Sequence, residues 1–324
     1  GVPDSAEAPR GGLAGPSTFA FVDSNVEAAW TPSVEPFDFM YVVPSGEASK
    51  SVRQYELACE WLAANGATRD SHLVAIGGGV VGDLVGFVAA TYMRGVAYTQ
   101  APTTLLSMVD SSVGGKVAVD LATGKNLLGA FYPPSRVLIP MDSLSTLPER
   151  QLTNGMAEVW KTAFISSTDF IGQLQNGLSH AEIIEHCIRH KAWVVENDEF
   201  ETTGLRATLN FGHTVGHALE HVTGYEPLLH GEAISIGMVL ESRLAEKLSV
   251  AEEGLANEIA EYLKSVGLPT TYDTAPIAEA LMETMFRDKK VKEGKLAFSF
   301  VPEMGTCKLV NDVPPETVRH ILLT

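Results

Sequence analysis

The chain has 324 residues, 45% of them hydrophobic and 19% charged, so it is long enough for one large or two ordinary domains and too apolar for extensive disorder. Forty acidic against 23 basic residues give a formal net charge of −17, which argues against a nucleic-acid partner or a membrane surface, because both require basic patches. Three widely spaced cysteines form no disulfide framework and indicate a reducing compartment.

The N-terminal residues 1–17 are rich in glycine, proline and alanine and are expected to form a flexible leader. They lack the basic start and apolar core of a secretory signal. The most apolar stretch, residues 73–93, is interrupted by Asp83 and several glycines and is too polar for a spanning helix. These features predict a cytoplasmic protein, with a plastid location left open because a transit peptide removed earlier would leave no trace.

Short apolar strands alternate with helical patterns over the first half of the chain. A helix is expected over 51–65 and another after the glycines at 77–79. The expected strands are 19–22, 39–43, 73–76, 96–101 and 136–139. This alternation predicts a mostly parallel sheet covered by helices.

The patterns after residue 146 are nearly all helical. Pro148 and Glu149 form a typical helix start, with a proline early and an acid in the first turn. The expected helices are 148–166, 180–197, 207–222, 231–247, 252–266 and 276–287, followed by a hairpin from 295–301 and 306–310. We therefore predict an α/β domain at 1–146 and a mainly helical domain at 147–324.

The first motif with chemical content is IGGGVVGD at residues 76–83, which follows an expected strand and opens a helix. Glycines at such a turn let a phosphate approach the backbone amides of a helix N-terminus. The spacing fits GxGxxG, but the acid about twenty positions downstream that usually binds the ribose is missing. The motif indicates either a dinucleotide site or simply a tight turn from strand to helix.

The second motif is NFGHTVGHALE at residues 210–220. It places His213 and His217 four positions apart on one face of the expected helix, with Asn210 one turn earlier. Both histidines could bind a metal, or one could bind while the other acts as an acid or base. The zinc-protease pattern HExxH is absent.

Two further segments carry the partners that such histidines would need. His230 stands just before another expected helix, and Glu158 and Lys161 lie three positions apart in MAEVWK. A metal site is one interpretation of these residues. Surface histidines and an ordinary ion pair are the other.

The third motif is rich in glycine, hydroxyl groups and lysine, and comprises TT at 103–104, DSSVGGK at 110–116 and GKN at 124–126. It suits an anionic ligand, although it is no Walker loop and could be a solvated loop instead. An anion bound by so acidic a chain needs a local group of cations. The basic residues that stand inside the motifs are Arg94, Lys116, Lys125, Lys161, Lys191, Arg206 and Lys289.

These segments occur together in one order, as GGGVVGDLVGFVAATYMRGV, PTTLLSMVDSSVGGKVAVD, GKNLLGAFYPP, TLPERQLTNGMAEVWK, LNFGHTVGHALE and LLHGEAISIGM. From about residue 22 to the C-terminus, the chain resembles the 3-dehydroquinate synthase family of the shikimate pathway, which leads to chorismate and the aromatic amino acids. NGMAEVWKTA and RHKAWVV resemble the version that opens the pentafunctional arom polypeptide more than the single bacterial enzyme.

The resemblance implies a fold and a set of cofactors. The fold would be an N-terminal Rossmann-like NAD-binding α/β domain and a C-terminal, mainly α-helical metal-binding domain, with the active site in the cleft between them. A divalent metal, zinc with cobalt as an alternative, would be held by Glu158, His213 and His230. Members of the family are usually homodimers, so the same is expected here.

The resemblance also assigns residues to the two ligands. NAD would be bound by Asp23, Asn25, Glu47, Lys50, Gly78, Gly79, Asp83, Thr103, Thr104 and Asp110. The substrate would be bound by Arg94, Lys116, Lys125, Asn126, Lys161, Lys191, Arg206, Asn210, His217 and Lys289. Catalytic roles would fall on Asp110, Lys116, Lys161, Asn210 and His217.

The activity so implied is that of a carbon–oxygen lyase acting on a phosphate, which converts 3-deoxy-D-arabino-heptulosonate 7-phosphate to 3-dehydroquinate. NAD would transiently oxidise a ring hydroxyl, phosphate would be eliminated, NADH would reduce the ketone, and ring opening and an aldol step would close the carbocycle. The alternatives are a cyclase acting on sedoheptulose 7-phosphate and a metal-dependent polyol dehydrogenase. A catalytically dead scaffold is a further alternative, but it would be expected to have lost a metal ligand.

Overall fold

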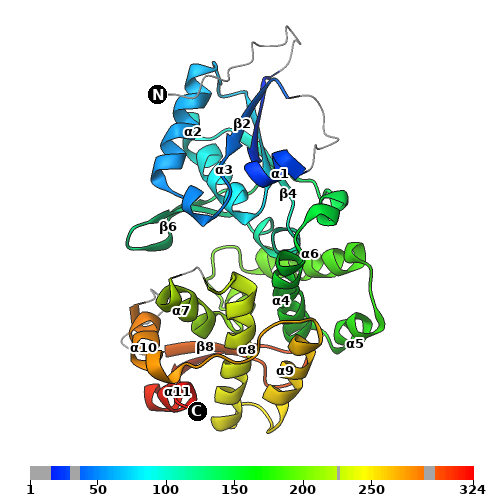
Figure 1. The fold of residues 1–324 in the computed structure, drawn as a ribbon, viewed down its shortest axis with the longest axis vertical. Coiled ribbons are helices and arrows are strands. Elements are labelled where there is room, and N and C mark those ends of the chain that lie inside the picture. Colours follow the sequence, from blue (N-terminus) through cyan, green and yellow to red (C-terminus); the bar gives the residue numbers. More distant parts are fainter. Residues whose placement is uncertain (1–15, 30–36, 225–226, 288–295) are drawn as a thin grey trace. The chain divides into compact units, whose positions relative to one another are not determined.

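The computed structural model describes residues 16–29, 37–224, 227–287 and 296–324. The chain divides into two compact units, Gly1–Leu147 and Pro148–Thr324. The first holds a parallel sheet and the second is mainly helical, which confirms the predicted α/β fold class (Figure 1). Among the described residues, no helix is long and apolar enough to span a membrane.

The first unit is built on a sheet of five parallel strands. Residues of β1 face alternate sides, so Phe19 and Phe21 join one core and Ala20 and Val22 another. Both faces are buried, which explains why these strands are continuously apolar in sequence. The strand order is β2 (Phe39–Val43), β1 (Thr18–Asp23), β3 (His72–Gly77), β4 (Ala97–Pro102) and β7 (Arg136–Val137).

Helices α2 (Val52–Ala64) and α3 (Gly79–Thr91) cover the face that carries Phe19 and Phe21. The other face packs against Val26 of α1 (Ser24–Ala29). This arrangement places the carboxyl ends of β1, β3 and β4 at one edge of the sheet, because parallel strands all point the same way.

A hairpin of β5 (Lys116–Leu121) and β6 (Gly124–Phe131) occupies a stretch in which the sequence predicted no strand. Val117 and Val119 of β5 join the core under α3. A Cβ atom on Gly86 of α3 would lie 2.3 Å from Cγ1 of Val117, so glycine is required for this close approach. The apolar alternation in this stretch is short and is interrupted by glycines and lysines, so it did not indicate a strand.

The second unit is centred on α8, whose side chains are mostly buried. This helix packs against α4, α7, α9 and α11, and the hairpin β8–β9 completes the core. The elements are α4 (Glu149–Ser166), α5 (Thr168–Asn176), α6 (His180–Asn197), α7 (His213–Thr223), α8 (His230–Lys247), α9 (Leu255–Ser265), α10 (Ala278–Arg287), β8 (Leu296–Phe300), β9 (Lys308–Val313) and α11 (Pro315–Leu322).

The helix predicted over 207–222 is wrong at its start. The turn Arg206–Asn210 is a separate 3₁₀ helix, and α7 begins only at His213. Gly212 between them has a φ of +79°, and a Cβ atom there would lie 2.4 Å from Cγ of Met238. Asn210 therefore does not continue the histidine helix, and His213 is the first residue of α7.

Candidate functional site

Three helices of the second unit bring a carboxylate and two imidazoles together. Glu158 lies in α4, while His213 and His230 are the first residues of α7 and α8. Oε1 of Glu158 is 3.5 Å from Nε2 of His213 and 3.6 Å from Nε2 of His230. Neighbouring ligand atoms of a tetrahedral zinc ion, with bonds near 2.0–2.1 Å, are about 3.3 Å apart. The donor set and its spacing therefore fit such an ion.

The environment of Glu158 also fits a cation. The residue is 1% exposed, and its Oε1 accepts no hydrogen bond from the described residues. The ammonium of Lys161, itself buried, contacts the other oxygen. Burial raises the pKa of Glu158, but Lys161 and the two histidines outweigh it and hold that pKa well below its usual range. The carboxylate is therefore charged, and its Oε1 faces the two imidazoles without accepting a hydrogen bond from them, an arrangement that suits a metal ligand.

Each histidine of the group is oriented through its other ring nitrogen. Nδ1 of His213 lies 3.1 Å from the carbonyl oxygen of Phe211, and Nδ1 of His230 lies 3.1 Å from Oε2 of Glu220. A proton held on Nδ1 by such an acceptor leaves the Nε2 lone pair for a metal. No role was predicted for the buried Glu220, although it stands seven residues after His213 and so on the same helix face.

His217 lies beside this group but is exposed. Its ring centroid is 5.1 Å from that of His213 and 5.9 Å from that of His230. With Glu220 and His230 it forms a second possible metal-binding group, which shares His230 with the first and so is not independent of it. Glu158 thus lies beside His213, whereas His217 lies on the solvent side. Of the two alternatives for this histidine pair, the structure therefore favours His213 as a metal ligand and His217 as an acid or base.

The remaining predicted residues of the second unit differ in what holds them. Lys191 of α6 and Asn210, at the end of its 3₁₀ turn, are half-buried. Arg206 is buried, and its Nη1 donates to the carbonyl oxygen of Glu199 at 2.6 Å. Lys289 lies outside the described residues. The guanidinium of Arg206 is thus engaged with its own loop, so its role toward the substrate stays a prediction.

Asp198 holds this loop, and stability is expected to depend on its charge. Its carboxylate accepts backbone N–H groups of Arg206, Thr203 and Thr202 at 2.9, 3.0 and 2.8 Å. These bonds, with that from Arg206 the strongest, lower the pKa of Asp198 far below its usual value. Because the folded pKa is depressed, the stabilisation is present above the unfolded pKa of about 3.9 and is lost as the pH falls toward the folded value.

We therefore expect Asp198→Asn to lower the melting temperature at neutral pH, by an amount that shrinks as the pH falls below about 4. Thermal unfolding of both proteins over a pH series measures this. Glu199→Gln is the matched control, because its side chain is exposed and its contact to Arg206 is made by the backbone. A difference between Asp198→Asn and wild type that stays constant with pH would contradict the assignment.

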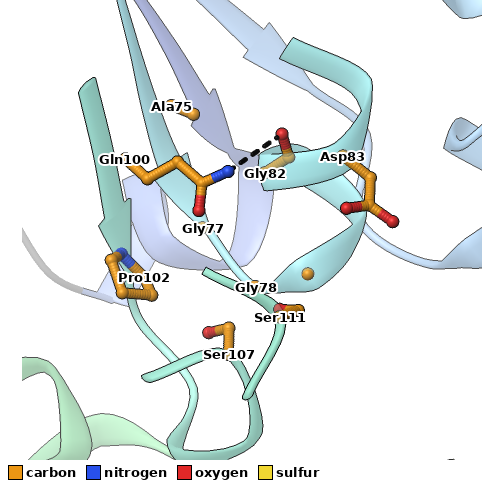
Figure 2. Close-up of a pocket in the computed structure, with 10 residues that line it drawn as sticks. Ala75, Gly77, Gly78, Gly82, Asp83, Gln100, Pro102, Ser107 and Ser111 are labelled. Atoms are coloured by element: carbon orange, nitrogen blue, oxygen red, sulfur yellow. Dashed lines mark hydrogen bonds between the residues drawn. The ribbon is translucent and has the colours of Figure 1, made fainter. Parts of the chain in front are cut away.

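The first unit carries its candidate site at the carboxyl edge of the sheet. The glycine turn joins β3 to α3 beside a small hollow. Open parallel sheets bind nucleotides at this edge, where a helix N-terminus faces the phosphates. Figure 2 shows the residues around the hollow, which are Ala75, Gly77, Gly78, Gly79, Gly82, Asp83, Gln100, Pro102, Ser107 and Ser111.

The glycines of the turn are packed closely against their neighbours. A Cβ atom on Gly78 would lie 3.2 Å from Cγ2 of Thr104, and one on Gly79 would lie 3.1 Å from Oγ of Ser111. A Cβ atom on Gly77 would lie 3.1 Å from Cβ of Asp23, which places the end of β1 next to the turn. The backbone here is accessible to a ligand only while these positions carry no side chain.

Several residues predicted to bind NAD pair with each other. Lys50 is buried and Asp83 is half-buried, and they form a salt bridge in which Nζ of Lys50 lies 2.5 Å from Oδ2 of Asp83. Burial lowers the pKa of Lys50, but Asp83, together with Glu47 and Asp120, outweighs it, and the pKa is raised. Glu47 lies 3.2 Å from Nζ of Lys125, a predicted substrate residue. Asp23 accepts the backbone N–H of Asn25 at 2.8 Å.

The segment after β4 continues this edge. Thr103 is buried, and within the described part of the chain its hydroxyl finds no partner. Thr104 and Ser107 join their hydroxyl groups at 2.8 Å, and Asp110 lies in the π-helical turn Ser107–Ser111. The sequence missed Gln100, whose Nε2 points toward the carbonyl of Gly82 at 3.5 Å (Figure 2). Its apolar strand gave no indication that it would face the hollow.

The other predicted substrate residues of this unit stand on or near the hairpin. Lys116 begins β5, and Asn126 in β6 has a φ of +57° and donates its backbone N–H to Asp120 at 2.8 Å. Arg94 follows α3 with a φ of +67°. The structure brings the NAD candidates to one sheet edge and the metal candidates to one helical cluster, each within its own unit.

Two family models match the chain in succession. The model described as 3-dehydroquinate synthase N-terminal matches residues 40–154, and that described as 3-dehydroquinate synthase C-terminal matches residues 155–291. A curated relative from Caldanaerobacter subterraneus subsp. tengcongensis, named 3-dehydroquinate synthase, is 42% identical over 321 residues. The match covers 94% of this chain and 89% of the relative.

Solved structures with the same fold include two sugar phosphate cyclases. A 2-epi-5-epi-valiolone synthase from Streptomyces hygroscopicus subsp. jinggangensis, with NAD⁺ and Zn²⁺ bound, matches with a TM-score of 0.83 at 25% identity, covering 96% of this chain and 91% of that one. A 2-deoxy-scyllo-inosose synthase complexed with carbaglucose-6-phosphate, NAD⁺ and Co²⁺ matches with a TM-score of 0.81 at 26% identity, covering 95% and 90%.

Proposed function

The chain belongs to the 3-dehydroquinate synthase family, and from that premise we propose how its own residues divide the work of the reaction. The enzyme converts 3-deoxy-D-arabino-heptulosonate 7-phosphate to 3-dehydroquinate and phosphate. The observation that carries the assignment of the chemistry is the group Glu158, His213 and His230, in which the buried Oε1 of Glu158 faces both imidazoles.

The enzyme uses NAD and a divalent metal, as the two solved cyclases do. Two imidazoles and one carboxylate suit zinc and would also accept cobalt. When bound, the metal lowers the pKa of a substrate hydroxyl and so assists its oxidation. NAD is proposed to bind at the glycine turn, where Gly78 and Gly79 leave the start of α3 accessible and Asp23 lies close by.

The residues around the metal group have separable roles in this proposal. Lys161 keeps Glu158 ionised, and Phe211 and Glu220 orient the two histidines. The exposed imidazole of His217, which is not part of the group with Glu158, relays the proton of the substrate hydroxyl. Cationic side chains are proposed to neutralise the carboxylate and phosphate of the substrate, and Asn126 and Asn210 are proposed to form hydrogen bonds with it. The cations are Arg94, Lys116, Lys125, Lys161, Lys191, Arg206 and Lys289.

The identity of the substrate rests on the degree of similarity. The chain is 42–45% identical to curated 3-dehydroquinate synthases but only 25–26% identical to the two cyclases that are named for other products. A polyol dehydrogenase would release NADH, whereas this reaction returns its hydride to the substrate. We also propose that the protein is a homodimer, as members of the family usually are, and that it is located in the cytoplasm.

The proposed function predicts phosphate release without net formation of NADH. The protein with NAD and zinc should release phosphate from the heptulosonate phosphate while absorbance at the NADH band returns to its starting value. EDTA should reduce the rate by at least about a thousandfold, equivalent to about 4 kcal/mol in the barrier, because the metal stabilises charge in the transition state.

The control is sedoheptulose 7-phosphate under the same conditions, for which little or no release is expected. If phosphate were released faster from sedoheptulose 7-phosphate than from the heptulosonate phosphate, the assigned substrate would be wrong. Stoichiometric accumulation of NADH would instead identify a dehydrogenase.

A further inference from the structure

Both histidines of the metal group are the first residue of a helix, and another helix holds each of these helix starts by a buried side chain. The first N–H groups of a helix have no partner within the helix, so an acceptor from elsewhere fixes where the helix begins. A histidine at the first position moves with that start. The acceptors at these two positions therefore bear directly on the geometry of the metal group.

Asn154 holds the start of α8. It lies in α4, one turn before Glu158, and is 4% exposed. Its Oδ1 accepts the backbone N–H of Gly231 at 2.6 Å, one residue after His230. A Cβ atom on Gly231 would lie 2.0 Å from the carbonyl oxygen of Asn154, so the two backbones are in direct contact. This short hydrogen bond and the glycine contact, together with the ion pair of Arg150 in α4 and Glu232 in α8, hold His230 in place relative to Glu158.

Glu241 holds the start of α7 from within α8 and is fully buried. Its Oε2 accepts the N–H of Gly212 at 2.8 Å, and its Oε1 accepts the N–H of Val215 at 3.0 Å. These donors flank His213 on both sides, and Gly212 offers no side chain that could cap the helix itself. A Cβ atom on Gly237 would lie 2.0 Å from the carbonyl oxygen of Gly212, so α8 also touches this start directly.

We propose that Asn154 and Glu241 are positioning residues of the metal centre. Asn154 of α4, the helix of Glu158, holds the start of α8, where His230 lies. Glu241 of α8 in turn holds the start of α7, where His213 lies. The three ligands thereby keep the spacing that fits a zinc ion. The inference rests on the proposed function, and it assigns a metal-related role to two residues that are not themselves candidate ligands.

A purely structural role would predict a different outcome. Glu246, five residues further along α8, makes the same kind of contact, because its Oε1 accepts the N–H groups of Gly254 and Ala256 at 3.0 and 2.8 Å. These groups belong to the start of α9, which carries no metal ligand. If such contacts served packing alone, Glu246→Gln and Glu241→Gln would have similar effects on zinc binding.

The test compares full-length Asn154→Ala, Asn154→Asp, Glu241→Gln and Glu246→Gln. Zinc affinity is measured by competition with a chromophoric chelator, NAD affinity by fluorescence titration, and folding by circular dichroism. We expect about 10–100-fold weaker zinc binding in Asn154→Ala and Glu241→Gln, typical of lost support for a ligand, with NAD affinity unchanged. Asn154→Asp keeps the acceptor and should restore most of the affinity, and Glu246→Gln should bind zinc like wild type.

Zinc affinities within about twofold of wild type in folded Asn154→Ala and Glu241→Gln would overturn this inference alone. If the wild-type protein itself bound no zinc, both this inference and the metal chemistry of the proposed function would be overturned. If Glu241→Gln does not fold, the contrast between Asn154→Ala and Asn154→Asp decides, because these two variants differ in the acceptor at one site.

Discussion

Glu158→Gln is expected to lower the turnover number by at least about a thousandfold, or about 4 kcal/mol in the barrier. The amide removes the negative charge that faces the two imidazoles and that pairs with the ammonium of buried Lys161. Zinc affinity should fall with turnover, because the variant retains only two of the three proposed ligands. Phosphate release with saturating NAD and substrate, and zinc content after dialysis, measure the two effects.

Glu220→Gln is the graded comparison for this experiment. Its amide oxygen can still accept from Nδ1 of His230, so only the charge of the supporting residue is lost. We expect a loss of zinc affinity of about tenfold, with NAD affinity preserved in both variants because NAD is proposed to bind in the other unit. Full zinc occupancy in Glu158→Gln would remove Glu158 from the ligand set and with it the central element of the proposed site.

The sheet was predictable from the sequence because its strands are buried on both faces. Runs such as those at 19–22 and 73–76 are continuously apolar and are bounded by turn residues, so their length and position follow from composition. The hairpin at 116–131 was not predictable in the same way. Only Val117 and Val119 of β5 join the core, and the lysines and glycines around them gave the pattern of a loop.

The same distinction applies to the metal group. His213, His217 and Glu220 are spaced by helical periodicity, so a shared face could be predicted, but the break at Gly212 depends on the close packing of Met238 and was invisible locally. Glu241 lies in an apolar segment 28 positions after His213, and only the fold brings it to the backbone N–H groups of Gly212 and Val215 on either side of that histidine. Long-range partners of this kind leave no periodic pattern in a single sequence.

The role of His217 is the question that the histidine spacing left open, and its replacement should separate the alternatives. We expect His217→Ala to lower turnover by about a hundredfold or more, the usual contribution of a positioned acid or base. Zinc content and NAD affinity should stay at the wild-type level, because Glu158, His213 and His230 complete the ligand set without it. The measurements are single-turnover phosphate release and zinc analysis on the same preparation.

Metal content, measured beside turnover, separates the two roles of a histidine. A metal ligand and a proton relay both reduce turnover, but only loss of a ligand releases zinc, so His217→Ala and His213→Ala should differ in metal content while both are slow. His221→Ala is the matched control, since this exposed histidine lies one turn further along α7 and has no proposed role. Loss of zinc from His217→Ala would assign it to the metal, and this would make the second group, with Glu220 and His230, the occupied one.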